Sequence, residues 1–229
     1  MRLEVKENSK NYACSVVEIK NLFPIEGADN LLRTVVNGNN VVVPKTTEVG
    51  SRMLYFVSGT KLSAEYCRVN NLYDKEENNL DTTKRGFVSF KSRRIKCLRL
   101  RGVISDGMLM PLSSLLPFLE QSSINYLKVG DEFTDIELNG RVYNICEKYT
   151  VPTKENNQGS QKTSKTNKLK ELLLDTQFRF HHETEHFVKH QNKFTQETEL
   201  IITRKLHGSS LILSNVLITK KLPLKDKDR

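Results

Sequence analysis

Short runs of apolar and β-branched residues, separated by turn-forming residues, occupy the first quarter of the chain. The runs cover residues 12–19, 31–36, 41–43 and 53–57. Between the second and third runs stands Asn37-Gly38, which is a strong local signal for a β-hairpin. Strands this short at this spacing predict a small antiparallel barrel or sandwich.

A polar stretch follows at 58–85, which we expect to be a long, exposed insertion. The most basic part of the chain comes next, at 84–101, where cationic residues alternate with apolar and aromatic ones. In a strand, Arg94, Lys96 and Leu98 lie on one face, and Ile95, Cys97 and Arg99 lie on the other. Such a face suits a groove that follows a nucleic-acid backbone. The candidate nucleic-acid contacts are Arg93, Arg94, Lys96, Arg99 and Arg101.

The two phenylalanines of this basic stretch, Phe87 and Phe90, allow two interpretations. They serve as stacking platforms for bases beside the cationic residues, or they belong to the core of a barrel whose outer face is solvated. Because apolar aromatic side chains are usually buried, we favour the core for both. The charges themselves fit either interpretation equally well.

Composition indicates a net positive charge and reduced cysteines. The 229 residues include 36 Lys and Arg against 27 Asp and Glu, and the formal net charge of +9 is compatible with nucleic-acid binding. The four cysteines are widely spaced and contain no Cys-x-x-Cys pair, which predicts reduced thiols without a zinc knuckle or disulfide framework. No signal peptide or membrane-length apolar run occurs, so we expect a cytoplasmic protein without membrane contact.

Residues 151–170 contain almost no apolar side chains and are rich in Lys, Asn, Gln, Ser and Thr. This composition predicts a flexible linker. We therefore expect one domain at 1–150 and a second at 171–229.

The second domain contains the most chemically suggestive residue of the chain, Lys205. An apolar run at 200–203 leads to it, a turn with Gly208 follows, and a second apolar run begins at Leu211. This pattern predicts strand, turn and strand. A lysine amine becomes a nucleophile when desolvation or nearby positive charge lowers its pKa. Gly208 lets the backbone approach a bound nucleotide closely.

The segment Lys205-Leu-His-Gly208-Ser-Ser resembles the first motif of the covalent nucleotidyltransferases, the superfamily of DNA ligases, RNA ligases and capping enzymes. His207 stands where most members have aspartate, which is similar to the RNA-ligase branch. The resemblance implies that Lys205 attacks the α-phosphorus of ATP, with Mg²⁺ as cofactor. AMP then passes to the 5′-phosphate end of an RNA, and a 3′-hydroxyl displaces it to seal the strand. Arg204 departs from the glutamate that is common before the lysine.

The N-terminal part resembles members of the same superfamily. Residues 23–30 are similar to the front half of an oligonucleotide-binding (OB) barrel, an opening that tRNA-binding modules share. Residues 99–112 resemble the segment that closes this barrel in bacterial and phage RNA ligases, which place it before the catalytic domain. The implied fold is mainly β with an α+β part. It comprises an N-terminal OB-like β-barrel and an incomplete, ATP-grasp-like nucleotidyltransferase domain.

The resemblance also implies a nucleotide site. His207 and Gly208 belong to the nucleotide pocket, and residues 178–186 occupy its approach. There, Phe180 or His181 is expected to contact the adenine or the ribose.

Ligases of this superfamily need further motifs for ribose, metal and phosphates after the lysine. Only nineteen residues follow Ser210. We therefore expect a truncated ligase that is inactive alone and that pairs with a complementary C-terminal fragment.

Two other interpretations stay open. His182-Glu-Thr-Glu-His186 matches the His-Glu-x-x-His pattern of zinc hydrolases. Its intervening residues are polar and no third ligand stands at a family spacing, so we predict no metal-ligand residues. The other interpretation is a non-catalytic nucleic-acid-binding protein, in which residues 1–150 fold and the rest is a vestigial tail.

Overall fold

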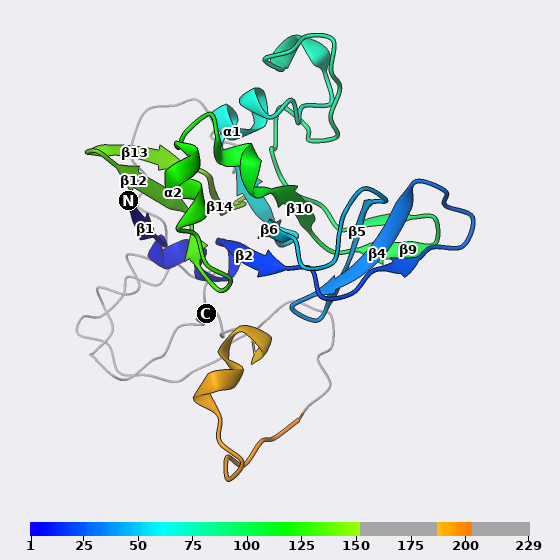
Figure 1. Cartoon of the computed structure of the whole chain (residues 1–229), viewed down its shortest axis with the longest axis vertical. Coiled ribbons are helices and arrows are strands. Elements are labelled where there is room, and N and C mark those ends of the chain that lie inside the picture. Colours follow the sequence, from blue (N-terminus) through cyan, green and yellow to red (C-terminus); the bar gives the residue numbers. More distant parts are fainter. Residues whose placement is uncertain (152–186, 203–229) are drawn as a thin grey trace, which may run out of the picture. The chain divides into compact units, whose positions relative to one another are not determined.

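The computed structural model describes residues 1–151 and 187–202. Residues Met1–Val151 belong to one compact unit, which is mainly β (Figure 1). Its strands are β1 (Arg2–Glu4), β2 (Cys14–Glu18), β3 (Phe23–Pro24), β4 (Leu31–Val36), β5 (Asn39–Pro44), β6 (Arg52–Phe56), β7 (Thr60–Leu62), β8 (Leu98–Leu100), β9 (Val103–Ser105), β10 (Met108–Pro111), β11 (Glu132–Phe133), β12 (Asp135–Leu138), β13 (Arg141–Asn144) and β14 (Cys146–Lys148). The helices are short: α1 (Ala64–Val69), α2 (Gln121–Asn125) and the 3-10 helices η1 (Glu7–Tyr12), η2 (Glu76–Asn78), η3 (Leu112–Leu115) and η4 (Phe187–Lys193).

The centre of this unit is an antiparallel sheet with the strand order β10-β6-β2-β11. In its register, Ser15 of β2 lies opposite Tyr55 of β6, and Phe56 lies opposite Met108 of β10. The remaining strands form the sheets β1-β12-β13, β3-β4-β5, β14-β7 and β8-β9. Figure 1 shows β9 lying beside β5, with which it is in contact.

Alternation along the central strands separates two hydrophobic clusters. In β6, Leu54 and Phe56 belong to the larger cluster, whereas Tyr55 belongs to the smaller one. In β2, Val16 and Val17 divide in the same way. Because successive side chains of a strand point to opposite faces, each face of the sheet has its own cluster.

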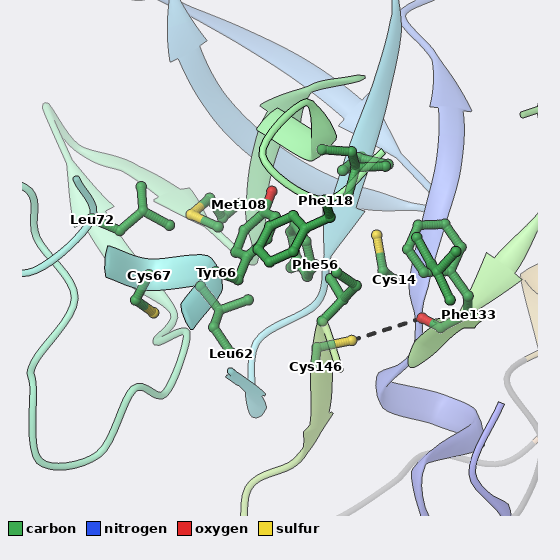
Figure 2. Close-up of a cluster of buried hydrophobic side chains, with 14 of the residues drawn as sticks. Cys14, Phe56, Leu62, Tyr66, Cys67, Leu72, Met108, Phe118, Phe133 and Cys146 are labelled. Carbon is green, nitrogen blue, oxygen red and sulfur yellow. Dashed lines mark hydrogen bonds between the residues drawn. The ribbon is translucent and has the colours of Figure 1, made fainter. Parts of the chain in front are cut away.

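Aromatic rings occupy the middle of the larger cluster. The ring centroids of Phe56 and Tyr66 are 5.5 Å apart, and Tyr66 stacks on Phe118 at 6.1 Å. The buried hydroxyl of Tyr66 shares a hydrogen bond of 2.7 Å with Oγ of Ser114. Figure 2 shows these rings at the centre of the cluster, with Leu72 and Phe133 towards its two ends.

The four apolar runs at the start of the chain form β2, β4, β5 and β6, as predicted. Asn37 and Gly38 have φ angles of 49° and 80°, and β4 pairs with β5 across them. Positive φ at both central residues is what a two-residue type I′ turn requires. The predicted hairpin is therefore confirmed.

The prediction that 58–85 is an exposed insertion is wrong. This stretch contains β7 and α1, and Oγ of Ser63 caps α1 by accepting a hydrogen bond of 3.1 Å from the backbone N–H of Tyr66. Tyr66 and Tyr73 are 0% and 1% exposed. A few large side chains anchor the stretch to the core, and its polar average composition hides them.

The prediction of a strand before Lys205 is also wrong for the part of the apolar run that the structure describes. Leu200, Ile201 and Ile202 lie outside any strand and are 50%, 88% and 93% exposed. Apolar and β-branched residues favour a strand when a neighbouring strand packs against them. Within residues 1–151 and 187–202, no strand pairs with this run.

Candidate nucleic-acid interface

Ile95 fixes the middle of the basic stretch. Its side chain is 3% exposed and packs in the larger cluster. Its backbone N–H donates to the Thr60 carbonyl at 2.8 Å, and its carbonyl accepts from the Gly59 N–H at 2.9 Å. The residues on either side, Arg94 and Lys96, are both exposed. Their separation from Ile95 agrees with the alternation of an extended backbone.

Arg93 lies differently from its neighbours. Its φ is 49°, in the left-handed region of backbone conformation that residues other than glycine seldom adopt. Burial raises the pKa of Cys67 to about 12 and also raises the pKa of Tyr73, and the nearby Arg93 guanidinium opposes both shifts. Its Nε is buried and has no hydrogen-bond partner among the described residues. The structure thus places Arg93 towards the core and does not bring it to the exposed side with Arg94.

Arg99 and Arg101 lie on the β8–β9 hairpin. Arg99 pairs with Ile104, and the turn consists of Arg101 and Gly102, with φ angles of 47° and 80°. Both arginines are exposed. The hairpin is joined to β5, because Oγ of Ser105 accepts a hydrogen bond of 3.0 Å from the backbone N–H of Val42.

A pocket of about 860 Å³ lies between the basic stretch and strands β5, β6 and β10. The basic stretch contributes two cations, four apolar residues and a serine to its lining: Phe87, Ser89, Arg94, Ile95, Lys96, Leu98 and Leu100. The strands contribute mainly apolar residues, among them Val42, Met53, Met108, Leu109 and Met110. The carboxylate residues Glu48 and Asp74 also line it. The pocket therefore combines an apolar interior with cations and hydrogen-bond acceptors.

The prediction that Phe87 and Phe90 belong to the core is wrong. The two side chains are 60% and 53% exposed. Val88 and Ile95, which are 2% and 3% exposed, anchor this stretch in their place. Phe87 lines the pocket. Phe90 instead contacts Tyr73 edge-on, with ring centroids 5.1 Å apart.

The family comparison matches the part of the chain that contains this pocket. Residues 13–112 match a family model described as an OB-fold domain. The chain contains an OB-fold domain. The predicted mainly β fold with an N-terminal OB-like domain is thus confirmed, and every residue that lines the pocket lies within the matched range.

Solved structures similar to this chain include RNA ligases of Naegleria gruberi. The ligase with PPi has a TM-score of 0.40 at 24% identity, covering 68% of this chain and 39% of that one. A mutant with ATP and Mn has a TM-score of 0.41 at 22% identity, covering 65% and 38%. An apo mutant has a TM-score of 0.39 at 25% identity, covering 64% and 38%. The chain thus spans less than two fifths of the length of these ligases. No curated protein matches the sequence.

The other candidate residues fall outside the described part of the chain. They are the nucleophile Lys205, the nucleotide contacts Phe180, His181, His207 and Gly208, and the histidines His182 and His186 of the zinc-hydrolase pattern. The predicted linker at 151–170 lies outside it too, apart from its first residue, so the domain boundaries stay predictions. Within 1–151 and 187–202, no cluster of three or more His, Cys, Asp or Glu residues could hold a metal ion. No helix of this part is long and apolar enough to cross a bilayer.

Sequence reasoning missed the opposite wall of the pocket in the OB-fold domain. Met53, Leu109 and Met110 come from strands whose apolar residues are typical of a barrel core, and their pattern contains no signal for a pocket. The position of Phe87 among cations was a signal for ligand contact. We nevertheless favoured burial, because phenylalanine is usually buried.

Proposed function

We propose that the OB-fold domain binds RNA through the exposed side of its basic stretch. The observation that carries this proposal is the position of exposed Phe87 at one pocket with two exposed cations, Arg94 and Lys96. A positively charged groove that presents aromatic rings suits single-stranded nucleic acid. Arg99 and Arg101 extend the positive charge along the hairpin.

We further propose that the chain supplies the RNA-binding domain and the nucleophile of an ATP-dependent RNA ligase. Support comes from the Lys205-Leu-His-Gly208 motif, which follows an OB-fold domain in the chain. The amine of Lys205 would attack the α-phosphorus of ATP and release pyrophosphate. AMP bound to Lys205 would then pass to a 5′-phosphate, and a 3′-hydroxyl would displace it to join two RNA ends. Mg²⁺ would neutralise charge on the triphosphate.

RNA binding is tested by fluorescence anisotropy with a labelled single-stranded RNA over a series of salt concentrations. We expect binding to weaken with salt, because each phosphate contact to a single strand contributes about 0.7 to the slope of log K against log salt. The double variant Arg94→Ala/Lys96→Ala should reduce this slope by about 1.4. The double variant Lys128→Ala/Arg141→Ala removes the same charge from exposed residues that do not line the pocket. An equal loss in both variants would contradict the proposed interface.

The ligase proposal is tested by incubating the chain with α-labelled ATP and Mg²⁺. Label that is retained after denaturation and lost in Lys205→Ala would establish a lysyl-AMP enzyme. A chain that binds RNA but accepts no label would favour the second candidate function, a non-catalytic RNA-binding protein. That candidate is supported by the pocket and its cations, all of which lie within the OB-fold domain. Addition of a complementary ligase fragment to the unlabelled chain tests whether labelling needs a partner.

A further inference from the structure

We propose that the pocket of the OB-fold domain takes the base of an unpaired nucleotide, with Phe87 as its stacking surface and the adjoining phosphates on Arg94 and Lys96. This inference rests on the proposed RNA binding and deepens it, because it states which part of the RNA enters the pocket. It also distinguishes Phe87 from Phe90, which is similarly exposed but does not line the pocket.

Backbone hydrogen bonds hold Phe87 in place from both sides. The N–H of Gly86 donates to the Tyr73 carbonyl at 2.7 Å, and the N–H of Val88 donates to the Leu72 carbonyl at 2.8 Å. The N–H of Asp74 donates back to the Val88 carbonyl at 3.0 Å. An exposed ring on a fixed backbone loses little conformational freedom when a ligand stacks on it.

Close packing at Gly86 adds to this constraint. A Cβ atom at this position would lie 2.2 Å from the backbone carbon and oxygen of Leu72. The two backbone segments therefore approach as closely as they do because residue 86 has no side chain. The ring of Phe87 lies next to this contact and outside the core.

The interior of the pocket suits an uncharged, flat ring. Leu98, Leu100 and Met110 line it with apolar atoms, and its volume of about 860 Å³ falls in the range of small-molecule sites. Leu98 and Leu100 are 41% and 36% exposed, so their apolar surface is open to a ligand. Burial of this surface against a base contributes favourably to binding.

The charges of the pocket orient the nucleotide. Glu48 and Asp74 line it together with the cations, and carboxylates repel a phosphate while accepting hydrogen bonds from the amino groups of a base. Arg94 and Lys96 are exposed, and the Arg94 guanidinium lies 5.1 Å from the ring centroid of Tyr149. Asp74 is half-buried, whereas Arg94 and Lys96 are exposed, so the base would enter the pocket and the phosphates would stay at the exposed cations.

The experiment compares two ligands of equal length and charge. One is a single-stranded oligoadenylate, and the other is a ribose–phosphate oligomer without bases. We expect the wild-type chain to bind the oligoadenylate about tenfold more tightly, as the loss of base stacking implies. Phe87→Ala should remove most of this difference and leave affinity for the baseless oligomer unchanged.

Two further variants make the result specific. Phe87→Tyr keeps an aromatic ring and should preserve the preference for the oligoadenylate. Phe90→Ala removes an exposed ring that does not line the pocket and should preserve it too. Thermal unfolding of each variant shows whether it is folded.

The outcomes separate this inference from the proposed function. Equal binding of both ligands by the wild-type chain would overturn the base pocket and leave electrostatic RNA binding standing. A preference that survives Phe87→Ala would also overturn it. Binding of neither ligand would overturn the pocket and the proposed RNA binding together.

Discussion

The larger hydrophobic cluster and the basic stretch use aromatic side chains in opposite ways. In the cluster, Phe56 and Tyr66 are both 0% exposed and contact each other through their rings. In the basic stretch, Phe87 is 60% exposed, although its neighbour Val88 is buried. Aliphatic residues attach this stretch to the fold and leave the aromatic ring towards solvent. Phe87 lines one pocket together with the exposed Leu98 and Leu100, and apolar surface gathered in a groove is typical of a ligand site.

The largest expected contrast is between two phenylalanine truncations. Phe56→Ala removes a fully buried ring and should lower the free energy of unfolding by about 3–5 kcal/mol. Phe87→Ala should change it by less than about 0.5 kcal/mol, because most of the ring is already in water. Urea unfolding of both variants measures the contrast. A large loss from Phe87→Ala would mean that the ring supports the fold and would remove the reason to assign it to a ligand.

The second contrast concerns two glycines with positive φ. Gly107 has a φ of 118°, and a Cβ there would lie 2.5 Å from the Tyr55 ring and 2.7 Å from the Phe56 carbonyl oxygen. Gly107→Ala should therefore cost about 2–4 kcal/mol from strain and overpacking.

Gly102 of the β8–β9 turn is the matched control. Its φ is 80°, but a Cβ there would meet no atom within 4 Å. Gly102→Ala should cost only about 1 kcal/mol of backbone strain. Thermal or urea unfolding distinguishes the two variants, and equal losses would show that the contact of Gly107 with Tyr55 adds nothing.

The central strands were predictable because turn-forming residues separate short runs of β-branched, aromatic and other apolar residues. Leu54, Tyr55 and Phe56 are apolar together, yet flanking turns and β-type residues were enough to identify β6. Asn37-Gly38 identified its hairpin because few residue pairs adopt positive φ easily.

The candidate site was predictable only in part. The alternation around Ile95 correctly separated Arg94 and Lys96 from the core, but it wrongly placed Cys97 and Arg99 on the face of Ile95, since both are exposed. The inward position of Arg93 depends on its positive φ, for which the sequence has no signal. The pocket depends on residues far apart in the chain, such as Met53 and Leu98, which only the tertiary fold brings together.

The third contrast is between buried and exposed cysteines, and it appears in the dependence of stability on pH. Burial raises the pKa of Cys67 and of Cys146 from 9.0 to about 12, whereas Cys97 of the basic stretch is exposed. An unfolded thiol ionises near pH 9, while these two stay protonated in the folded chain until about pH 12. The unfolded state therefore loses protons first. The stability contributed by each buried thiol is complete below pH 9 and falls as the pH rises from 9 towards 12.

This fall in stability with rising pH predicts a measurable difference between single cysteine variants. Between pH 8 and pH 10, each buried thiol should lower the free energy of unfolding by about 1.4 kcal/mol. In Cys67→Ala this drop should be smaller than in the wild-type chain by that amount, whatever the variant's stability at pH 8. Cys97→Ala is the control variant, because it removes a thiol that is exposed in the folded chain. If the drop stays the same in Cys67→Ala, water reaches that thiol in the folded chain. The core beside Tyr73 would then be as open as the basic stretch, and the contrast between the two regions would not hold there.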